Sequence, residues 1–239
     1  MTMNPLTMLR PVRAGNAFEE TVERLLQAIK LGVVGPGEKL PPERELAVQL
    51  GISRVTLREA IRALQEAGYL DVRRGRYGGA FVTYVPPPPG QADLRKAVAD
   101  MGLADLSDAL TFRMAVECGA AEVLATSELT DEQRALLGRK LSELNEAGVD
   151  DYRRLDTAFH LSIAELTGSP LLATACADAR LRVSDLLNAI PMLQVNLDHA
   201  AVQHQAIVAA ILAGDPDAAR RAVAEHLEGT AALLRAFLA

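Results

Sequence analysis

The sequence predicts a mainly α-helical chain of two domains, the first small and ending in a β-hairpin, the second larger and entirely helical. Apolar residues recur at helical spacing along most of the 239 residues. The exceptions are two short strand-like runs, 69–73 and 80–84. Shortly after them come four consecutive prolines, which favour an extended polyproline conformation. We therefore expect a short, stiff linker at residues 86–91.

Composition excludes several classes of protein. The chain has no run of about 18 apolar residues, so neither a transmembrane helix nor a membrane partner is predicted. Its first residues lack the continuous apolar core of a signal peptide, and we therefore expect a cytoplasmic protein. Cys118 and Cys176 lie in apolar helical patterns without metal-type spacing. They are predicted to be buried free thiols, because disulfides are rare in reducing compartments.

Charge is distributed unevenly along the chain. Residues 1–89 contain 12 Lys and Arg against 9 Asp and Glu, a net charge of +3. Residues 90–239 contain 13 against 22, a net charge of −9, and the two parts together give the overall −6. A basic front and an acidic rear are typical of a nucleic-acid-binding module joined to a domain with a different task. Charge also drifts along ordinary soluble proteins, so this asymmetry alone is a weak indication.

Three helices are predicted in the first domain. Residues 1–17 show no periodic pattern and are expected to form a mobile tail, whereas apolar spacing predicts a helix from Phe18 to about Leu31. A second helix opens at two prolines and runs to Leu50, since proline is tolerated in a first turn. After a Gly-containing turn, Ser53 is a suitable N-cap for a third helix over 54–67.

The third helix has two different faces. Val55, Leu57, Ile61 and Leu64 are apolar and predict a core-facing side, while arginines occupy other positions. The hairpin that follows has a basic, glycine-rich tip, Arg74-Gly75-Arg76-Tyr77-Gly78-Gly79. Three helices and such a hairpin make a winged helix-turn-helix over residues 18–85, with the third helix lying against DNA.

The second domain, residues 92–239, is predicted to be an antiparallel all-α bundle of about seven helices. Local signals support the helix ends: Thr130 with Gln133 resembles a capping box, and Gly168 and Gly214 stand where helices should stop. The predicted segments lie near 92–101, 105–126, 131–147, 149–167, 169–189, 193–213 and 216–237.

Histidine is rare in this sequence, and three of the four histidines follow a pattern. Asp156 and His160 are four residues apart on one predicted helix and therefore share a face, while His204 and His226 occupy interior-type positions of the last two helices. Three imidazoles and one carboxylate suit a divalent metal such as Zn²⁺, with coordination positions left open. Spacing alone leaves open a second interpretation, in which these are hydrogen-bonded core histidines and a capping aspartate.

The stretch PGEKLPPERELAVQLGISRVTLREAIRALQEAGYLDVRRGRYGGAFV resembles the winged-helix signature of the GntR family of bacterial transcription regulators. The resemblance covers residues 18–84. The second domain resembles the FCD-type effector domain of the FadR subfamily, and the segment 92–101 suggests its seven-helix variant. This implies a DNA-binding regulator, acting as a homodimer on a palindromic double-stranded operator.

The resemblance also implies DNA contacts. Family positions that contact operator bases or phosphates are filled here by Arg44, Ser53, Arg54, Thr56, Arg58, Arg74 and Gly75. The chemistry agrees, because arginine binds guanine O6 and N7 bidentately, small hydroxyls hold phosphates, and arginine is drawn into a narrow minor groove. Pro42 departs from the family, which usually has serine there, so no contact is carried over to it.

The second domain's segment LDTAFHLSIAELTGSPLL resembles the family's Asp-x3-His motif, and the two later histidines fall in its later motifs. By resemblance the metal ligands are Asp156, His160, His204 and His226, with Zn²⁺ favoured and Ni²⁺ or another transition metal possible. His199 matches no ligand position and is expected at the surface. Ser169 stands where the family often has asparagine, which removes no ligand.

The expected effector is a small carboxylate bound at the metal. Arg113 matches a family arginine that can face the ligand cavity and hold a carboxylate bidentately. The alternative for Arg113 is an ion pair with Glu117, one helical turn later.

Together these features predict a ligand-responsive transcription regulator, most simply a repressor, and not an enzyme. Three alternatives remain: a regulator that responds to the metal itself, a metal-dependent enzyme fused to a DNA-binding module, and purely structural histidines.

Overall fold

The computed structural model describes residues 17–75, 77–85, 96, 98–189 and 194–238. The chain separates into two compact units, Met1–Pro86 and Pro87–Ala239, which are treated separately below. The expected N-terminal tail, apart from Ala17, and the proline-rich linker lie outside the described residues. Among the helices that are described, none is long and apolar enough to cross a membrane.

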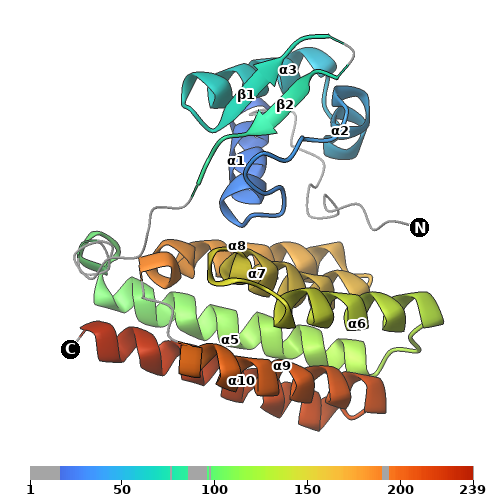
Figure 1. Cartoon of the computed structure of the whole chain (residues 1–239), viewed down its shortest axis with the longest axis vertical. Helices are drawn as coiled ribbons and strands as arrows, with labels where there is room; N and C mark the ends of the chain where they lie inside the picture. The colour runs from blue at the N-terminus through green and yellow to red at the C-terminus, as the bar shows by residue number, and fades with distance from the viewer. Residues whose placement is uncertain (1–16, 76, 86–95, 97, 190–193, 239) are drawn as a thin grey trace. The chain divides into compact units, whose positions relative to one another are not determined.

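The N-terminal unit is a winged helix-turn-helix, as the sequence predicts (Figure 1). Its helices are α1 (Ala17–Lys30), α2 (Glu43–Leu50) and α3 (Arg54–Glu66), followed by strands β1 (Leu70–Arg73) and β2 (Gly79–Val82). The strands pair antiparallel, with Leu70 opposite Val82 and Arg73 opposite Gly79, and Lys39 adds an isolated bridge to Phe81. The tip between the strands requires glycine at residue 75, where φ is +102°.

The turn between α2 and α3 is fixed by local chemistry. Gly51 ends α2 in the left-handed conformation, with φ of 67°. Ser53 begins α3, and its hydroxyl accepts the backbone N–H of Thr56 at 3.0 Å. Pro42 precedes α2 without any side-chain cap, as expected from the loss of the family's serine.

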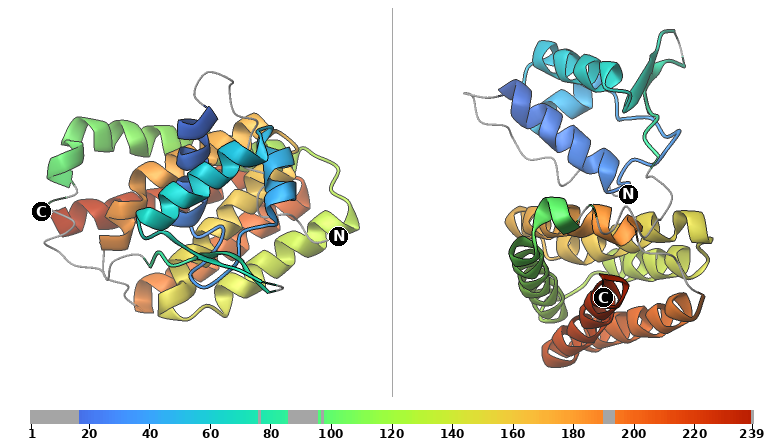
Figure 2. Two further views of the ribbon diagram at one scale, coloured as in Figure 1. Left: turned by 90° about the horizontal axis from the view of Figure 1, so that it is seen from above. Right: turned by 90° about the vertical axis from the view of Figure 1, so that its left-hand side faces the viewer.

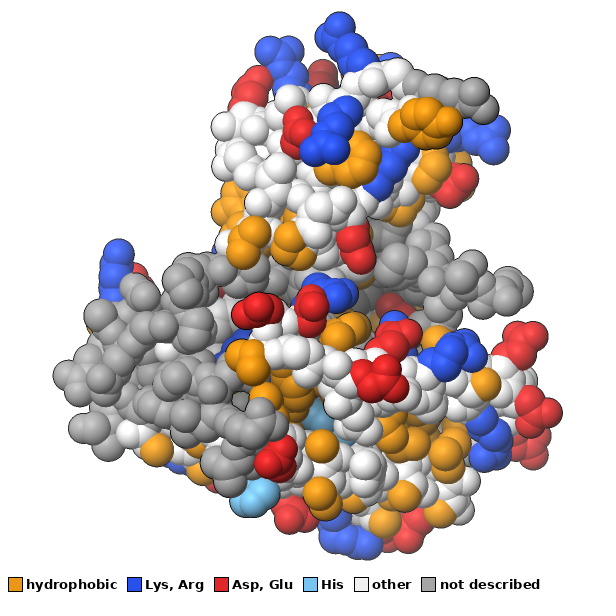
Figure 3. Space-filling model, in the orientation of Figure 1, with side chains coloured by type: hydrophobic (Ala, Val, Ile, Leu, Met, Phe, Trp, Pro, Cys, Tyr) orange, Lys and Arg blue, Asp and Glu red, His pale blue; other side chains and the backbone are white. Residues whose placement is uncertain are grey.

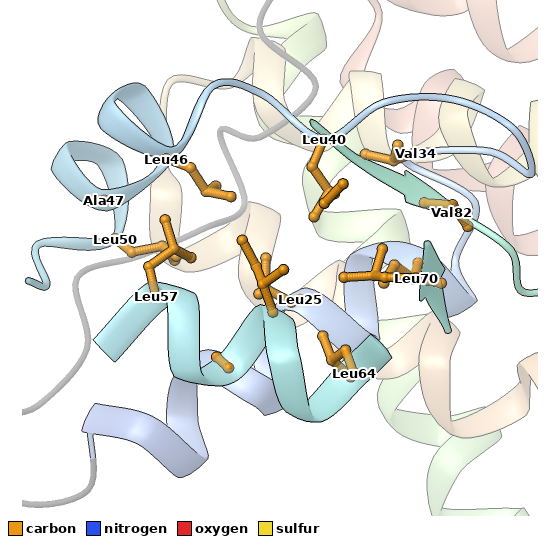
Figure 4. Packing of buried hydrophobic residues seen from close by; sticks show 14 residues of the cluster. Leu25, Val34, Leu40, Leu46, Ala47, Leu50, Leu57, Leu64, Leu70 and Val82 are labelled. Carbon is orange, nitrogen blue, oxygen red and sulfur yellow. The ribbon is translucent and has the colours of Figure 1, made fainter. Parts of the chain in front are cut away.

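A single apolar core holds these elements together. Leu25 of α1 lies among Leu46, Leu50, Leu57 and Leu64, all of them buried, and strand residues close one end (Figure 4). The expectation for Val55 was wrong, because its side chain is 65% exposed. Val55 precedes Leu57 by two residues, which at about 100° per residue places it on the opposite side of α3.

All regular secondary structure in the described part of the C-terminal unit is α-helical, again as predicted. The long helices are α5 (Leu103–Ala125), α6 (Asp131–Asn145), α7 (Val149–Leu166), α8 (Pro170–Ala189), α9 (Gln194–Ala213) and α10 (Pro216–Leu238). Residues 96 and 98–101 are also helical, while 92–95 and 97 of the first predicted segment lie outside the described residues. The predicted Thr130–Gln133 capping box is present at the start of α6.

Helix α5 is the central element of this unit. It packs against α7, α8, α9 and α10, and Figure 1 shows it between α8 and α10. Figure 2 shows the same stack from two further sides, with α9 and α10 adjacent. Cys118 of α5 and Cys176 of α8 are buried free thiols, as predicted. Burial, with the nearby Glu117 carboxylate, raises the pKa of Cys118 to about 11 and that of Cys176 to about 12.

Candidate metal centre and nucleic-acid interface

Three helices bring the four sequence-predicted ligands of the second domain together. Helix α7 supplies Asp156 and His160, α9 supplies His204 and α10 supplies His226, and one ligand atom from each lies within 4.8 Å of the others. Asp156 Oδ1 is 3.2 Å from His204 Nε2, 3.8 Å from His160 Nε2 and 4.0 Å from His226 Nε2. All three imidazoles therefore present the same nitrogen to one carboxylate oxygen.

Outer contacts fix the orientation of two of these rings. His160 Nδ1 lies 3.0 Å from Glu117 Oε2, and His226 Nδ1 lies 3.1 Å from Gln203 Oε1. Because each oxygen is an acceptor, each Nδ1–H donates, and the lone pair is left on Nε2, facing the centre. The third ring differs: within the described chain, His204 Nδ1 is buried without a hydrogen-bond partner.

Two buried arginines support the acidic groups. Arg180 of α8 donates from Nη1 to Glu117 Oε2 at 2.9 Å and from Nη2 to Asp156 Oδ2. Arg113 of α5 donates from Nε to Glu117 Oε1 at 2.7 Å. All four side chains are almost excluded from solvent, Asp156 being the most exposed at 15%. Two cations and two anions thus form a network of zero net charge beside the three rings.

The protonation states suit metal binding. Burial alone would raise the pKa values of Glu117 and Asp156, but the Arg180 guanidinium reverses this and holds both well below their usual range. Burial, with the nearby Arg180 charge, lowers the pKa of His160 to about 4, and burial beside two other rings lowers that of His226 well below normal. Neutral imidazoles and an ionised carboxylate are the forms that bind a metal ion. The donor set therefore fits a divalent cation.

Arg113 fulfils one of its two sequence-based interpretations, the ion pair, while its contact with an effector stays a prediction. It forms the ion pair with Glu117, and it also lines a cavity of about 440 Å³ between α5 and α10. Leu110, Met114 and Leu227 supply apolar walls, and the mouth carries Glu228 and Arg235, which form an ion pair. Leu227 directly follows His226, so the cavity adjoins the helix turn that carries a candidate ligand.

Sequence reasoning missed several residues of this site. Gln203 and Arg180 were not identified, because the sequence does not show that these two polar side chains turn toward the candidate ligands. Tyr152, one helical turn before Asp156, has a buried hydroxyl with no partner among the described residues. The remaining histidine, His199, is exposed, as expected.

The sequence-predicted DNA contacts lie on α2, α3 and the wing. Arg44 is exposed on α2. Ser53 caps α3, and Arg54, Thr56 and Arg58 lie in the first turns of that helix. The Arg54 and Arg58 side chains are 56% and 58% exposed. Arg74 and Gly75 are exposed at the wing tip. In Figure 3, Lys and Arg side chains project from the visible face of the N-terminal unit, drawn at the top.

Comparison with known proteins identifies both domains. Residues 18–82 match the model described as "Bacterial regulatory proteins, gntR family", and residues 108–229 match the FCD domain. The chain is 31% identical to the putative HTH-type transcriptional regulator RmpR of Mycobacterium gastri, covering 86% of this chain and 76% of that protein. It is 30% identical to the HTH-type transcriptional repressor NanR of Escherichia coli (strain K12 / DH10B), covering 95% and 88%.

A solved structure supports the fold. Escherichia coli McbR/YncC superimposes with a TM-score of 0.56 at 21% sequence identity, over 92% of this chain and 98% of that one.

Proposed function

Since this chain belongs to the GntR family of bacterial regulatory proteins, with an FCD domain behind its DNA-binding domain, we propose that a small organic acid bound at a metal ion controls its binding to operator DNA. Family membership already makes the chain a DNA-binding transcription regulator with a C-terminal effector domain, and not an enzyme. That finding removes the alternative of a metal-dependent enzyme fused to a DNA-binding module.

The convergence of three Nε2 atoms on Asp156 Oδ1 carries this proposal. Asp156, His160, His204 and His226 would hold the metal, and Zn²⁺ suits a set of three nitrogens and one oxygen, although Ni²⁺ and other transition metals accept the same donors. When bound, the ion supplies a positive centre with open positions for a ligand oxygen. Glu117 and Gln203 hold two rings in the tautomer that this requires.

The charge of the site favours an anionic effector. The ionised network of Arg113, Arg180, Glu117 and Asp156 is neutral, so a divalent ion would bring the buried site to a net charge of +2. A carboxylate reduces this excess, because opposite charges attract strongly where water is excluded. Arg113 lines the adjoining cavity and has terminal amino groups that can bind a second carboxylate. A small acid with a partly apolar body fits these walls.

The arrangement of the DNA-binding unit suggests how the regulator reads its operator. We assign DNA-binding to residues 18–85, a linker to 86–91 and effector binding with dimerisation to 92–239. The contacts proposed are Arg44, Ser53, Arg54, Thr56, Arg58, Arg74 and Gly75. A homodimer would place two α3 helices on a palindrome, with a spacing set by dimer geometry. We propose repression as its action, in the cytoplasm where its DNA lies; its relative NanR is named a transcriptional repressor.

The test combines metal analysis with ligand screening. The full-length protein, purified without chelator, is analysed for metal stoichiometry and then screened by thermal shift with acetate, malate and citrate. A ligand at about 100 times its Kd stabilises the folded state by about 2.7 kcal/mol, which such a screen detects. Binding to a duplex selected by the protein from random DNA is then measured by fluorescence anisotropy, with and without each acid.

Each result assigns one mechanism. Stoichiometric metal and an acid that changes DNA binding only in the metal-loaded protein support the proposal. DNA binding that follows the metal concentration without any acid assigns the metal-responsive regulator instead. A fully folded protein that retains no metal leaves the histidines with a structural role and refutes it.

A further inference from the structure

An acidic side chain lies among the proposed DNA-contacting arginines. Glu43, in the first turn of α2, places Oε2 2.7 Å from Arg58 Nε and 3.7 Å from Arg54 Nη2 of α3. The shorter of these two contacts joins residues that are 15 positions apart in the sequence and lie on different helices. A carboxylate here repels the phosphates of DNA, so its presence on this face calls for an explanation.

Fold stability does not provide that explanation. The Arg58 and Glu43 side chains are 58% and 38% exposed, and ion pairs of such exposure contribute little to folding. The core beneath them is formed by Leu46, Leu50 and Leu57, which do not depend on this pair. We therefore look for the role of this contact in how Arg54 and Arg58 bind DNA.

The geometry restricts how Arg58 can bind. With Nε donating to Glu43, the two terminal amino groups still have N–H bonds available for other partners. These two groups can donate in parallel to guanine O6 and N7, the commonest specific base contact. An unpaired arginine has many rotamers and can reach phosphates as easily as bases, and ordering it on binding costs conformational entropy.

We propose that Glu43 is a positioning residue for DNA sequence recognition: it holds Arg58, and more weakly Arg54, in a base-reading orientation and lowers affinity for DNA of unrelated sequence. The inference rests on the proposed operator contacts of these two arginines. Its effect is a higher ratio of specific to non-specific binding, obtained from one carboxylate that does not itself contact a base.

The chain provides a matched control. Glu45 stands in the same first turn of α2, has the same charge and is exposed, yet among the described residues no ion pair joins it to α3. Glu43→Gln and Glu45→Gln thus remove the same charge from the same helix end. Their difference isolates the contact with Arg58 from general repulsion and from the helix dipole.

The experiment measures binding of both full-length variants to two duplexes, one selected by the wild-type protein from random DNA and one of scrambled sequence, over a range of salt. For Glu43→Gln we expect tighter binding to the scrambled duplex, with a salt slope steeper by roughly 0.9 because Arg58 can neutralise another phosphate. Binding to the selected duplex weakens, so the specificity ratio falls about tenfold, a value within the usual range for one bidentate base contact. Glu45→Gln shifts both duplexes equally and leaves the ratio unchanged.

Arg58→Ala distinguishes the DNA contact of Arg58 from the positioning role of Glu43. In that background, Glu43→Gln should no longer change the specificity ratio, and a change that persists would show that Glu43 acts without Arg58. If Arg58→Ala alone leaves affinity and base preference unchanged, the proposed contact is wrong. If Arg58→Ala reduces specificity but Glu43→Gln behaves like Glu45→Gln, the contact stands and the positioning role of Glu43 is refuted.

Discussion

Replacing Arg180 by leucine tests the buried charge network most directly. Arg180 is 3% exposed and donates to both Glu117 and Asp156, so the change leaves two buried carboxylates without their shared cation. Arg113 still pairs with Glu117, whereas Asp156 loses the guanidinium that donates to it. Removing one partner of a buried ion pair costs about 3–5 kcal/mol, because the remaining charge stays desolvated.

That magnitude is large enough to measure. We expect the metal-free Arg180→Leu protein to lose about 3–5 kcal/mol of unfolding free energy at pH 7, which lowers Tm by roughly 10 °C in a domain of this size. The loss should shrink on acidification. In the wild type both carboxyls have pKa values well below normal, so their stabilising contribution is present above the unfolded-state pKa values and disappears as the pH falls through the folded-state ones.

The assay is urea unfolding followed by circular dichroism, after dialysis against chelator. Arg182→Leu is the matched control, since Arg182 is exposed on the same helix and its replacement should change stability by less than about 0.5 kcal/mol. A divalent ion should restore part of the loss in Arg180→Leu, because it supplies positive charge beside Asp156. A loss below about 1 kcal/mol, or an equal loss in both variants, would refute the description of a charge-compensated buried site.

Three further predictions concern single side chains of the C-terminal unit. His204→Ala should lose both bound metal and the response to acid in the DNA-binding assay, and full zinc occupancy measured in that variant would contradict the proposed ligand set. Burial raises the pKa of Glu165 to about 7, partly offset by Lys140, so its stabilising contribution is present below its unfolded pKa and is lost as the pH rises through 7. Between pH 5 and pH 8 the wild type should therefore lose about 2 kcal/mol of unfolding free energy that the Glu165→Gln variant does not lose, as measured in urea titrations. Equal pH dependence in the two proteins would show that this carboxyl is not buried. Tyr152→Phe removes a buried hydroxyl without a partner, so the metal-free protein should lose no stability, and a loss above about 1 kcal/mol would reveal a hydrogen bond.

Local signals explain why so much of the fold was predictable from sequence. The Ser53 cap depends on residues within one turn of the chain, and the apolar periods of the six long helices depend on their own residues. The Asp156–His160 pair was readable for the same reason, since residues four apart share a helix face.

Interactions between distant segments were not predictable in this way. Arg180 meets Glu117 across 63 residues, and His226 meets Gln203 across 23, so both contacts depend on how helices rotate against one another. The contact between Glu43 and Arg58 was missed because the angle between α2 and α3 is a property of the whole core. Val55 was assigned to the wrong side because its hydrophobicity, and not its helical angle, was given weight.

The unpartnered nitrogen of His204 has a consequence for exchange of the metal. Two of the three rings are held by acceptors, but His204 must keep its proton on a buried Nδ1 that no described group receives. Loss of such an outer acceptor typically lowers metal affinity by about 10–100-fold. His204 would therefore hold an ion less firmly than His160 and His226, and a chelator should remove the metal faster than from a site with all three rings supported. The time for which the ion stays bound would decide whether the regulator keeps one metal ion throughout its lifetime or exchanges it with free metal ions in solution.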